Sequence, residues 1–268
     1  MKRAGEMTAL ETYIRQRLQR KKLLLMTHAV VGYPSLEANM AMLEAMQRAD
    51  ADLVELQLPF SEPIADGPIF LHANQRALES GITREQYFAF MHRAAVNFDF
   101  HILMMGYYNS VFQMGHGPFC ASLAEHGGSG FLVADLPPEE ASDLYTYADA
   151  YHLAPIMFMT PTTPVPRLHQ IAQHARGFVY CVARKGVTGS PTDLDQSLSA
   201  FVSRCRQATP LPLALGFGLQ TGADLRRLHG LVDIGIVGTA LLAAWEQGGA
   251  QQYEALLQEL YAATKGYQ

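Results

Sequence analysis

The stretch Val54-Glu-Leu-Gln-Leu-Pro-Phe-Ser-Glu-Pro-Ile-Ala-Asp-Gly-Pro68 decides the fold of this 268-residue chain. Its first residues have the two-residue period of a buried β-strand, so that Glu55 and Gln57 lie on one face and the apolar residues Val54, Leu56 and Leu58 on the other. The prolines at 59 and 63 end this strand and start a loop. The stretch therefore predicts a strand with polar side chains on its interior face and a loop at its carboxyl end.

Glu55 and Asp66 are two carboxylates, one on the strand and one on the loop that leaves it. An unpaired buried glutamate is rare, and we therefore interpret Glu55 as a functional residue rather than as a buried acid with a local hydrogen bond. Asp66 also fits the turn-forming role of an Asp-Gly pair. Two acids in different surroundings can divide the work of proton transfer, which favours general acid–base chemistry.

Apolar runs of strand length alternate with helical spacing along the chain. The runs cover residues 23–31, 53–58, 101–106, 130–134, 155–159, 178–182, 212–216 and 234–237. Eight strands, most of them followed by a helix, predict an α/β protein with a (β/α)8 TIM barrel. An open doubly wound sheet is the alternative, but no GxGxxG sequence opens the chain. Since no Gly/Ser or Pro linker divides the sequence, we expect residues 1–268 to form a single TIM-barrel domain.

Helix signals lie between these runs. Ser35 precedes a helix over 36–49, Thr83 begins a capping pattern before 87–95, and Pro138 starts a helix toward residue 151. Further helices are expected over 194–206, 222–229 and 251–265, and another at Thr239. Residues 9–19 predict an extra N-terminal helix that covers the bottom of the barrel.

Three successive strand ends are rich in glycine. Barrel active sites lie at the carboxyl ends of the strands, where residues 186–189, 216–218 and 238–240 are expected. Glycine lets backbone N–H groups approach an anion, and a helix N-terminus adds its positive end. Any one of these turns also fits a simple tight turn, but three in succession favour a phosphate site. Asp135, at the end of the fourth strand, also fits a structural role in its loop.

Composition argues against several classes of protein. The net charge of −5 disfavours nucleic acid and membrane as partners. The basic cluster in residues 15–22 is interpreted as a solvated helix end. The ten histidines show no ligand spacing, so no metal site is predicted. Three cysteines without CxxC spacing and the absence of a secretory segment predict reduced thiols in a cytoplasmic protein.

The stretch 55–68 resembles the signature of the tryptophan synthase α chain family, which reads approximately LELGxPFSDPxADGP. The resemblance extends over nearly the whole chain. It includes Gly32-Tyr33-Pro34, Asn74-Gln75-Arg76-Ala77-Leu78, Ala134-Asp135-Leu136-Pro137, Gly186-Val187-Thr188-Gly189, Gly216-Phe217-Gly218 and Val237-Gly238-Thr239-Ala240.

This resemblance implies a retro-aldol lyase of tryptophan biosynthesis that splits indole-3-glycerol phosphate into indole and glyceraldehyde 3-phosphate. In that family Glu55 matches the general acid/base, and Asp66 matches the acid that stabilises positive charge on the indole N–H. Tyr180 matches a substrate-pocket tyrosine and Thr188 a loop threonine that orders Asp66. The phosphate cradle corresponds to Gly189, Gly218, Gly238 and Thr239. The resemblance implies no cofactor in this chain, and a partner β chain that carries pyridoxal phosphate, receives the indole and forms an α2β2 heterotetramer.

Four residues depart from the family pattern. Gln57 replaces the usual glycine of the signature, His28 replaces an apolar aromatic of the indole pocket, Glu62 replaces an aspartate, and Thr239 replaces a serine. Three alternatives to an active α subunit that works with a β chain remain open, and Gln57 and His28 motivate the second of them. One is a free-standing indole-3-glycerol phosphate lyase that releases indole. Another is a catalytically weakened regulatory subunit that activates the β chain, and a third is an unrelated phosphate-binding barrel isomerase.

Overall fold

A computed structural model describes residues 7–182, 191–216 and 218–265. In these ranges nine parallel strands form one sheet, in the order β5-β4-β3-β2-β1-β9-β8-β7-β6. The two edge strands, β5 (Ala154–Pro155) and β6 (Met157–Met159), are halves of one segment separated by Ile156. Because they are continuous in the chain, the two ends of the sheet meet and close it into a barrel. The predicted (β/α)8 barrel is thus confirmed, with β5 and β6 together as the fifth of eight strands.

The other strands match the predicted runs to within two residues at either end. They are β1 (Leu24–Val30), β2 (Leu53–Gln57), β3 (His101–Gly106), β4 (Gly128–Val133), β7 (Val179–Val182), β8 (Leu213–Gly216) and β9 (Ile234–Val237).

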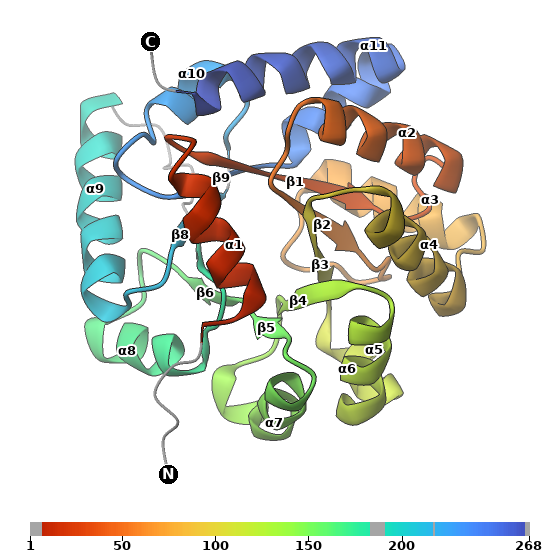
Figure 1. Ribbon diagram of the computed structural model, residues 1–268, viewed down its shortest axis with the longest axis horizontal. Coiled ribbons are helices and arrows are strands. Elements are labelled where there is room, and N and C mark those ends of the chain that lie inside the picture. The colour runs from red at the N-terminus through yellow and green to blue at the C-terminus, as the bar shows by residue number, and fades with distance from the viewer. Residues whose placement is uncertain (1–6, 183–190, 217, 266–268) are drawn as a thin grey trace.

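Helices surround the strands, as Figure 1 shows. They are α1 (Ala9–Leu18), α2 (Leu36–Arg48), α3 (Pro68–Glu79), α4 (Arg84–Asn97), α5 (Tyr108–Met114), α6 (His116–Glu125), the 3-10 helix η1 (Pro138–Glu140), α7 (Ser142–Ala150), α8 (Val165–His174), α9 (Pro191–Ala208), α10 (Gly222–Arg226) and α11 (Thr239–Thr264).

The predicted helix starts agree with the observed caps. The Ser35 side chain accepts a hydrogen bond from the backbone N–H of Ala38, and Thr83 forms a capping box with Gln86. Two expected helices differ from the structure. The one expected from Pro138 is interrupted at Ala141, whose φ of −113° separates η1 from α7. The one expected over 251–265 is the second half of α11, which bends where Gly249 has a φ of +60°.

Helix α1 covers the amino-terminal end of the barrel, as predicted. Leu10 and Ile14 belong to the cluster of buried side chains inside the barrel. The ring of Tyr13 lies 4.4 Å from that of His101, the first residue of β3. Figure 1 shows α1, drawn in red, crossing in front of the strands. This end of the barrel is therefore closed, and the opposite end is free for a site.

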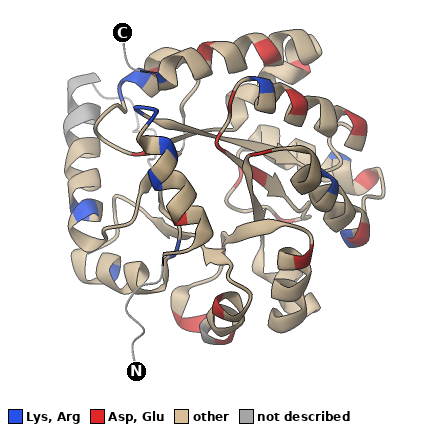
Figure 2. Ribbon diagram, viewed as in Figure 1, with Lys and Arg blue, Asp and Glu red and all other residues tan. Residues whose placement is uncertain are grey.

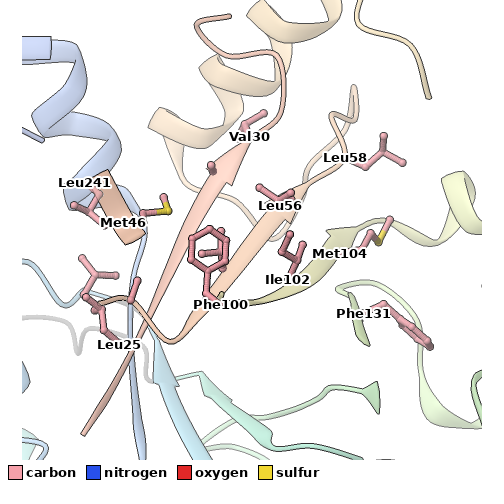
Figure 3. Close-up of a cluster of buried hydrophobic side chains, with 14 of the residues drawn as sticks. Leu25, Val30, Met46, Leu56, Leu58, Phe100, Ile102, Met104, Phe131 and Leu241 are labelled. Carbon is pink, nitrogen blue, oxygen red and sulfur yellow. The ribbon is translucent and has the colours of Figure 1, made fainter. Parts of the chain in front are cut away.

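The alternation of strand side chains separates two buried layers. Leu24, Met26 and Leu53 point into the barrel. Their neighbours Leu25, Leu56 and Ile102 point outward into a larger cluster beneath the helices. Figure 3 shows this outer cluster, in which Met46 of α2 and Leu241 of α11 pack against the strands. By this parity Glu55 and Gln57 point into the barrel, as expected.

The basic cluster near residues 15–22 is only partly a solvated helix end. Arg17 and Lys21 bind the buried Asp52 at 2.6 and 2.9 Å, and Asp52 also accepts the backbone N–H of Leu25. These pairs satisfy a carboxylate that would otherwise be buried alone. Basic and acidic residues are both distributed around the ring of helices (Figure 2). In the ranges that the structure describes, no helix combines the length and the apolar character needed to cross a membrane.

Candidate active site

Neighbouring strands bring three polar side chains together inside the barrel. In the parallel pairing of β1 with β2, His28 lies opposite Glu55 and Val30 lies opposite Gln57. All three polar side chains are nearly or fully buried, with Glu55 2% exposed and Gln57 0%. Asp66 lies on the loop 58–67, between β2 and α3. Its carboxylate joins this group of side chains by accepting a hydrogen bond from Gln57.

Glu55 is a buried carboxyl group. Within the described residues its Oε2 has no hydrogen-bond partner. The Nδ1 atom of the His28 imidazole lies 3.7 Å from this oxygen. Burial, and then the charge of Asp66, raise the pKa of Glu55 to about 8. Glu55 therefore carries a proton at neutral pH and can act as a general acid. The alternative of an acid whose Oε2 is satisfied by a local hydrogen bond does not fit this geometry.

Asp66 has two hydrogen-bond donors. The Gln57 amide Nε2 donates to its Oδ2 at 2.6 Å, and the Tyr107 hydroxyl donates to the same oxygen at 3.1 Å. The Tyr107 hydroxyl in turn accepts the backbone N–H of Ala65 at 3.2 Å. Burial raises the pKa of Asp66, and the two donors oppose that rise by stabilising the carboxylate. The two acids thus differ. Among the described residues, Oε2 of Glu55 has no hydrogen-bond donor, whereas the two donors to Asp66 stabilise its charged form.

His28 is fixed from two sides. Its Nε2 lies 2.9 Å from Oε1 of Gln57, and its ring stacks on Phe70 of α3 with a centroid distance of 4.4 Å. Burial lowers the pKa of His28 to about 4, so the ring is neutral at neutral pH.

Tyr180 points into the barrel from β7. Its ring lies 5.2 Å from that of Phe158, and a Cβ at Gly216 on the adjacent β8 would collide with its hydroxyl. Burial, together with the charges of Glu55 and Asp66, raises the pKa of Tyr180. The hydroxyl is therefore a neutral hydrogen-bonding group that lies within the electrostatic reach of both acids.

The predicted phosphate residues lie at the ends of β8 and β9. Gly218 has a φ of +82°, and Gly238 and Thr239 form the start of α11, where no side chain caps the helix. A Cβ at Gly238 would lie 3.1 Å from His28 and Phe70, so a side chain would crowd the site. The uncapped N–H groups of α11 can donate hydrogen bonds to a bound anion. Two further predicted residues, Thr188 and Gly189, lie outside the described residues.

Sequence reasoning assigned no role to Tyr107 and Phe70. The signal for Tyr107 was its position just after β3, where it continues the two-residue alternation of the inward-pointing Leu103 and Met105. Phe70 carried no such signal, since its contact with His28 depends on how α3 packs. For Asp135 the structural reading holds, because its Oδ1 accepts the backbone N–H of Tyr108 at 2.7 Å and ties two rim loops together.

A cavity of about 300 Å³ lies beside the ends of β4 and β6, and Ala134, Ile156 and Phe158 are among its lining residues. Neither Glu55 nor Asp66 lines this cavity, so it is not the site of the two acids. In the described part of the chain, no three His, Cys, Asp or Glu side chains are grouped closely enough to hold a metal ion.

Comparison with known proteins gives a consistent result. The profile of the family described as "Tryptophan synthase alpha chain" matches residues 14–268. The tryptophan synthase alpha chain of Desulforapulum autotrophicum is 46% identical over 251 residues, which cover 94% of this chain and 99% of that one. The alpha chain of Syntrophotalea carbinolica is 45% identical with the same coverage.

A solved structure agrees as well. A chain in a crystal structure of tryptophan synthase from M. tuberculosis superposes with a TM-score of 0.89 at 26% identity, covering 98% of this chain and 100% of that one. The barrel, the paired acids and the uncapped helix at Gly238 thus accompany similarity over almost the full length. The chain therefore belongs to the tryptophan synthase alpha chain family, the lyases that cleave indole-3-glycerol phosphate and supply indole to a β chain.

Proposed function

We propose that Glu55 and Asp66 are the catalytic residues with which this chain cleaves indole-3-glycerol phosphate into indole and glyceraldehyde 3-phosphate. The observation that carries this assignment is the contrast between the two acids. Glu55 is buried, with a pKa raised to about 8, whereas Asp66 accepts hydrogen bonds from Gln57 and Tyr107. One acid can therefore donate a proton while the other stabilises a positive charge.

The reaction needs both functions in sequence. Glu55 donates its proton to the indole ring carbon that bears the glycerol side chain, and the ring nitrogen becomes positively charged. Asp66 stabilises that charge through the ring N–H. The Glu55 carboxylate then takes the proton of the glycerol hydroxyl, the carbon–carbon bond breaks to form the aldehyde, and its electron pair returns to the ring. Glu55 ends protonated, so the cycle requires no external acid or base.

We assign substrate binding to the remaining predicted residues. Gly218, Gly238 and Thr239 are proposed to bind the phosphate, which is supported by the positive φ of Gly218 and the uncapped N-terminus of α11. Tyr180 is proposed to contact the substrate inside the barrel, which is supported by its position beside Gly216. For Thr188 and Gly189 the assignment rests on the family motif alone.

The partner is the β chain of tryptophan synthase, which in this family binds pyridoxal phosphate, whereas cleavage by the α chain needs no cofactor. We propose an α2β2 assembly in which the open end of the barrel faces that chain. Exposed apolar side chains on this rim support the proposal: Ile64 is 79% exposed after β2, and Phe112 is 62% exposed after β3.

Two further assignments are proposals. We propose that residues 1–268 act as one domain, which is supported by the single closed sheet of the described residues. We also propose a cytoplasmic location, which is supported by the free thiols of Cys120, Cys181 and Cys205.

Indole formation from indole-3-glycerol phosphate, measured with and without a β chain, tests these assignments. We expect turnover that the β chain stimulates, and Glu55→Gln should lower kcat at least about 100-fold while the protein folds normally. Near-wild-type turnover by Glu55→Gln would remove Glu55 from the mechanism. Fast turnover that the β chain leaves unchanged would favour a free-standing lyase. Absence of turnover together with a stimulated β chain would identify a regulatory subunit.

A further inference from the structure

One continuous set of contacts joins the two acids through Gln57 and His28. Asp66 Oδ2 lies 2.6 Å from Gln57 Nε2, and Gln57 Oε1 lies 2.9 Å from His28 Nε2. His28 Nδ1 then faces Glu55 Oε2 at 3.7 Å. These groups come from β1, β2 and the loop 58–67, and they meet inside the barrel.

The chemistry of these contacts fixes the direction of each hydrogen bond. An ionised Asp66 only accepts, so the Gln57 amide must turn its NH2 toward it and its carbonyl oxygen toward His28. His28 must then donate from Nε2. Because burial keeps the ring neutral, Nδ1 is left without a proton, and its lone pair points toward Glu55. A protonated Glu55 therefore faces an acceptor rather than a cation.

The surrounding residues fix the imidazole in place. Phe70 stacks on one face of the His28 ring, and a Cβ at position 238 would lie 3.1 Å from both the Cβ of His28 and the Phe70 ring, so the glycine leaves room for this stack. Two tyrosines also lie near the acids: Tyr107, directly after β3, donates to Asp66, and Tyr180 of β7 has a neutral hydroxyl. His28, Tyr107 and Tyr180 thus interact with Glu55 or Asp66 from outside β2 and its loop.

We propose that Gln57 is a positioning residue that acts on both acids: its amide NH2 holds Asp66 inside the barrel as a carboxylate, and its carbonyl oxygen selects the His28 tautomer whose free Nδ1 faces Glu55. This inference rests on the catalytic roles assigned to Glu55 and Asp66. It gives Gln57 and His28 a place in the reaction, although both stand where the family motif differs.

The pH dependence of turnover separates positioning from simple packing. In Gln57→Met the side chain keeps its length but loses both hydrogen bonds. The pKa of Asp66 should then rise, because the bond from Gln57 stabilises its carboxylate. We expect the acidic limb of the kcat–pH profile to move up by about one pH unit, and kcat at neutral pH to fall about tenfold with a smaller change in KM. A fall in kcat that is equal at every pH, with the acidic limb unmoved, would overturn the proposal.

Thr27→Val is the matched control. Thr27 lies next to His28 on β1 but points to the outer face, where its hydroxyl donates to the sulfur of Met46 at 3.1 Å. This variant loses a buried hydrogen bond without touching the acids. We expect its pH profile to match that of the wild type, and an equal displacement of the acidic limb in Thr27→Val would count against Gln57 as the cause.

Nitrogen NMR of the histidine side chains provides a readout that does not depend on activity. The signal of His28, identified by its loss in His28→Phe, should show a neutral ring protonated at Nε2 around neutral pH in the wild-type protein. In Gln57→Met it should shift toward a mixture of tautomers. A wild-type ring protonated at Nδ1 would overturn the proposal. If Glu55→Gln kept full turnover while the NMR result held, the catalytic assignment would fail and the hydrogen-bonded arrangement would stand.

Discussion

At the scale of single residues, the protonation states of the two acids depend on how far the protein shields each of them from water. Glu55 and Asp66 are chemically similar, but Glu55 lies on a buried strand and Asp66 on a loop that donors can reach. Desolvation disfavours the charged form of both groups, and only Asp66 recovers part of that loss through hydrogen bonds. The division of roles between acid and charge stabiliser follows from this difference in surroundings.

The raised pKa of Glu55 has a measurable effect on stability. It is about 8 in the folded protein against 4.5 for the free side chain, so the folded state binds an extra proton between these values. Stability linked to Glu55 is therefore fully present below about pH 4.5 and is lost as the pH rises through about 8. We expect Glu55→Gln to become more stable relative to the wild type by up to about 1.4 kcal/mol per pH unit across this window.

Urea unfolding at several pH values between these limits checks this prediction. Glu62→Gln, on the exposed part of the loop 58–67, is the control and should follow the wild type. A constant difference in unfolding free energy between Glu55→Gln and the wild type would show that Glu55 ionises normally in the folded protein.

At the scale of elements, strand register and one helix end assemble the site. The pairing of β1 with β2 places His28 opposite Glu55, and a slip of β1 by one residue would turn His28 to the outer face, away from Glu55. Helix α11 begins at Thr239, directly after β9, so its unpaired N–H groups point to the same edge of the barrel. These two features bring the acids and the proposed phosphate site to the same end of the strands.

Thr239→Asp tests the helix end with opposite effects on binding and stability. Thr239 is exposed. A carboxylate there should interact favourably with the helix dipole and raise the free energy of unfolding by about 0.3–1 kcal/mol. The same charge should repel the substrate phosphate and raise KM about fivefold, since like charges about 4 Å apart repel by about 1 kcal/mol even in water. Steady-state kinetics and urea unfolding measure the two effects. Thr239→Asn keeps the shape without the charge, and an equal rise in KM for both variants would place the phosphate elsewhere.

At the scale of the whole molecule, the barrel separates stability from chemistry. Its amino-terminal end is closed by α1 and by the ion pairs of Asp52 with Arg17 and Lys21. Its carboxyl-terminal end carries the acids, the uncapped start of α11 and the exposed apolar rim. Changes at the closed end should therefore alter folding without altering the reaction.

Ile14→Ala tests this separation. Ile14 is fully buried between α1 and the barrel interior, and removing its side chain should lower the free energy of unfolding by about 2–5 kcal/mol. We expect kcat and KM at a temperature where the variant is folded to stay close to those of the wild type. Denaturant unfolding and indole formation check the two parts. A large loss of kcat in the folded variant would mean that the closed end influences the site.

The order of the strands and of many helices was predictable from the sequence because it depends on neighbouring residues. Four helices of the structure, α3, α5, α6 and α8, were not among those expected. The alternation around Glu55, the caps at Ser35 and Thr83, and the start of α11 at Thr239 are local patterns, and the structure contains all of them. The end of one helix signal at Ala141 was missed, because its backbone angles follow from packing rather than from propensity. Glu55 could be singled out for the same local reason, since a carboxylate is unusual on an apolar strand. Asp66 lies on the loop, and its role was implied by the family resemblance.

Only the tertiary structure decided how these residues act together. His28 and Gln57 are 29 positions apart, and Tyr107 is 41 positions from Asp66, yet each pair forms a hydrogen bond. The sequence by itself determined that the chain carries eight strands, two acids and glycine-rich strand ends. Closure of the barrel determined which side chains meet and which lose water, and because pKa values depend on that loss, it also determined which acid carries the proton.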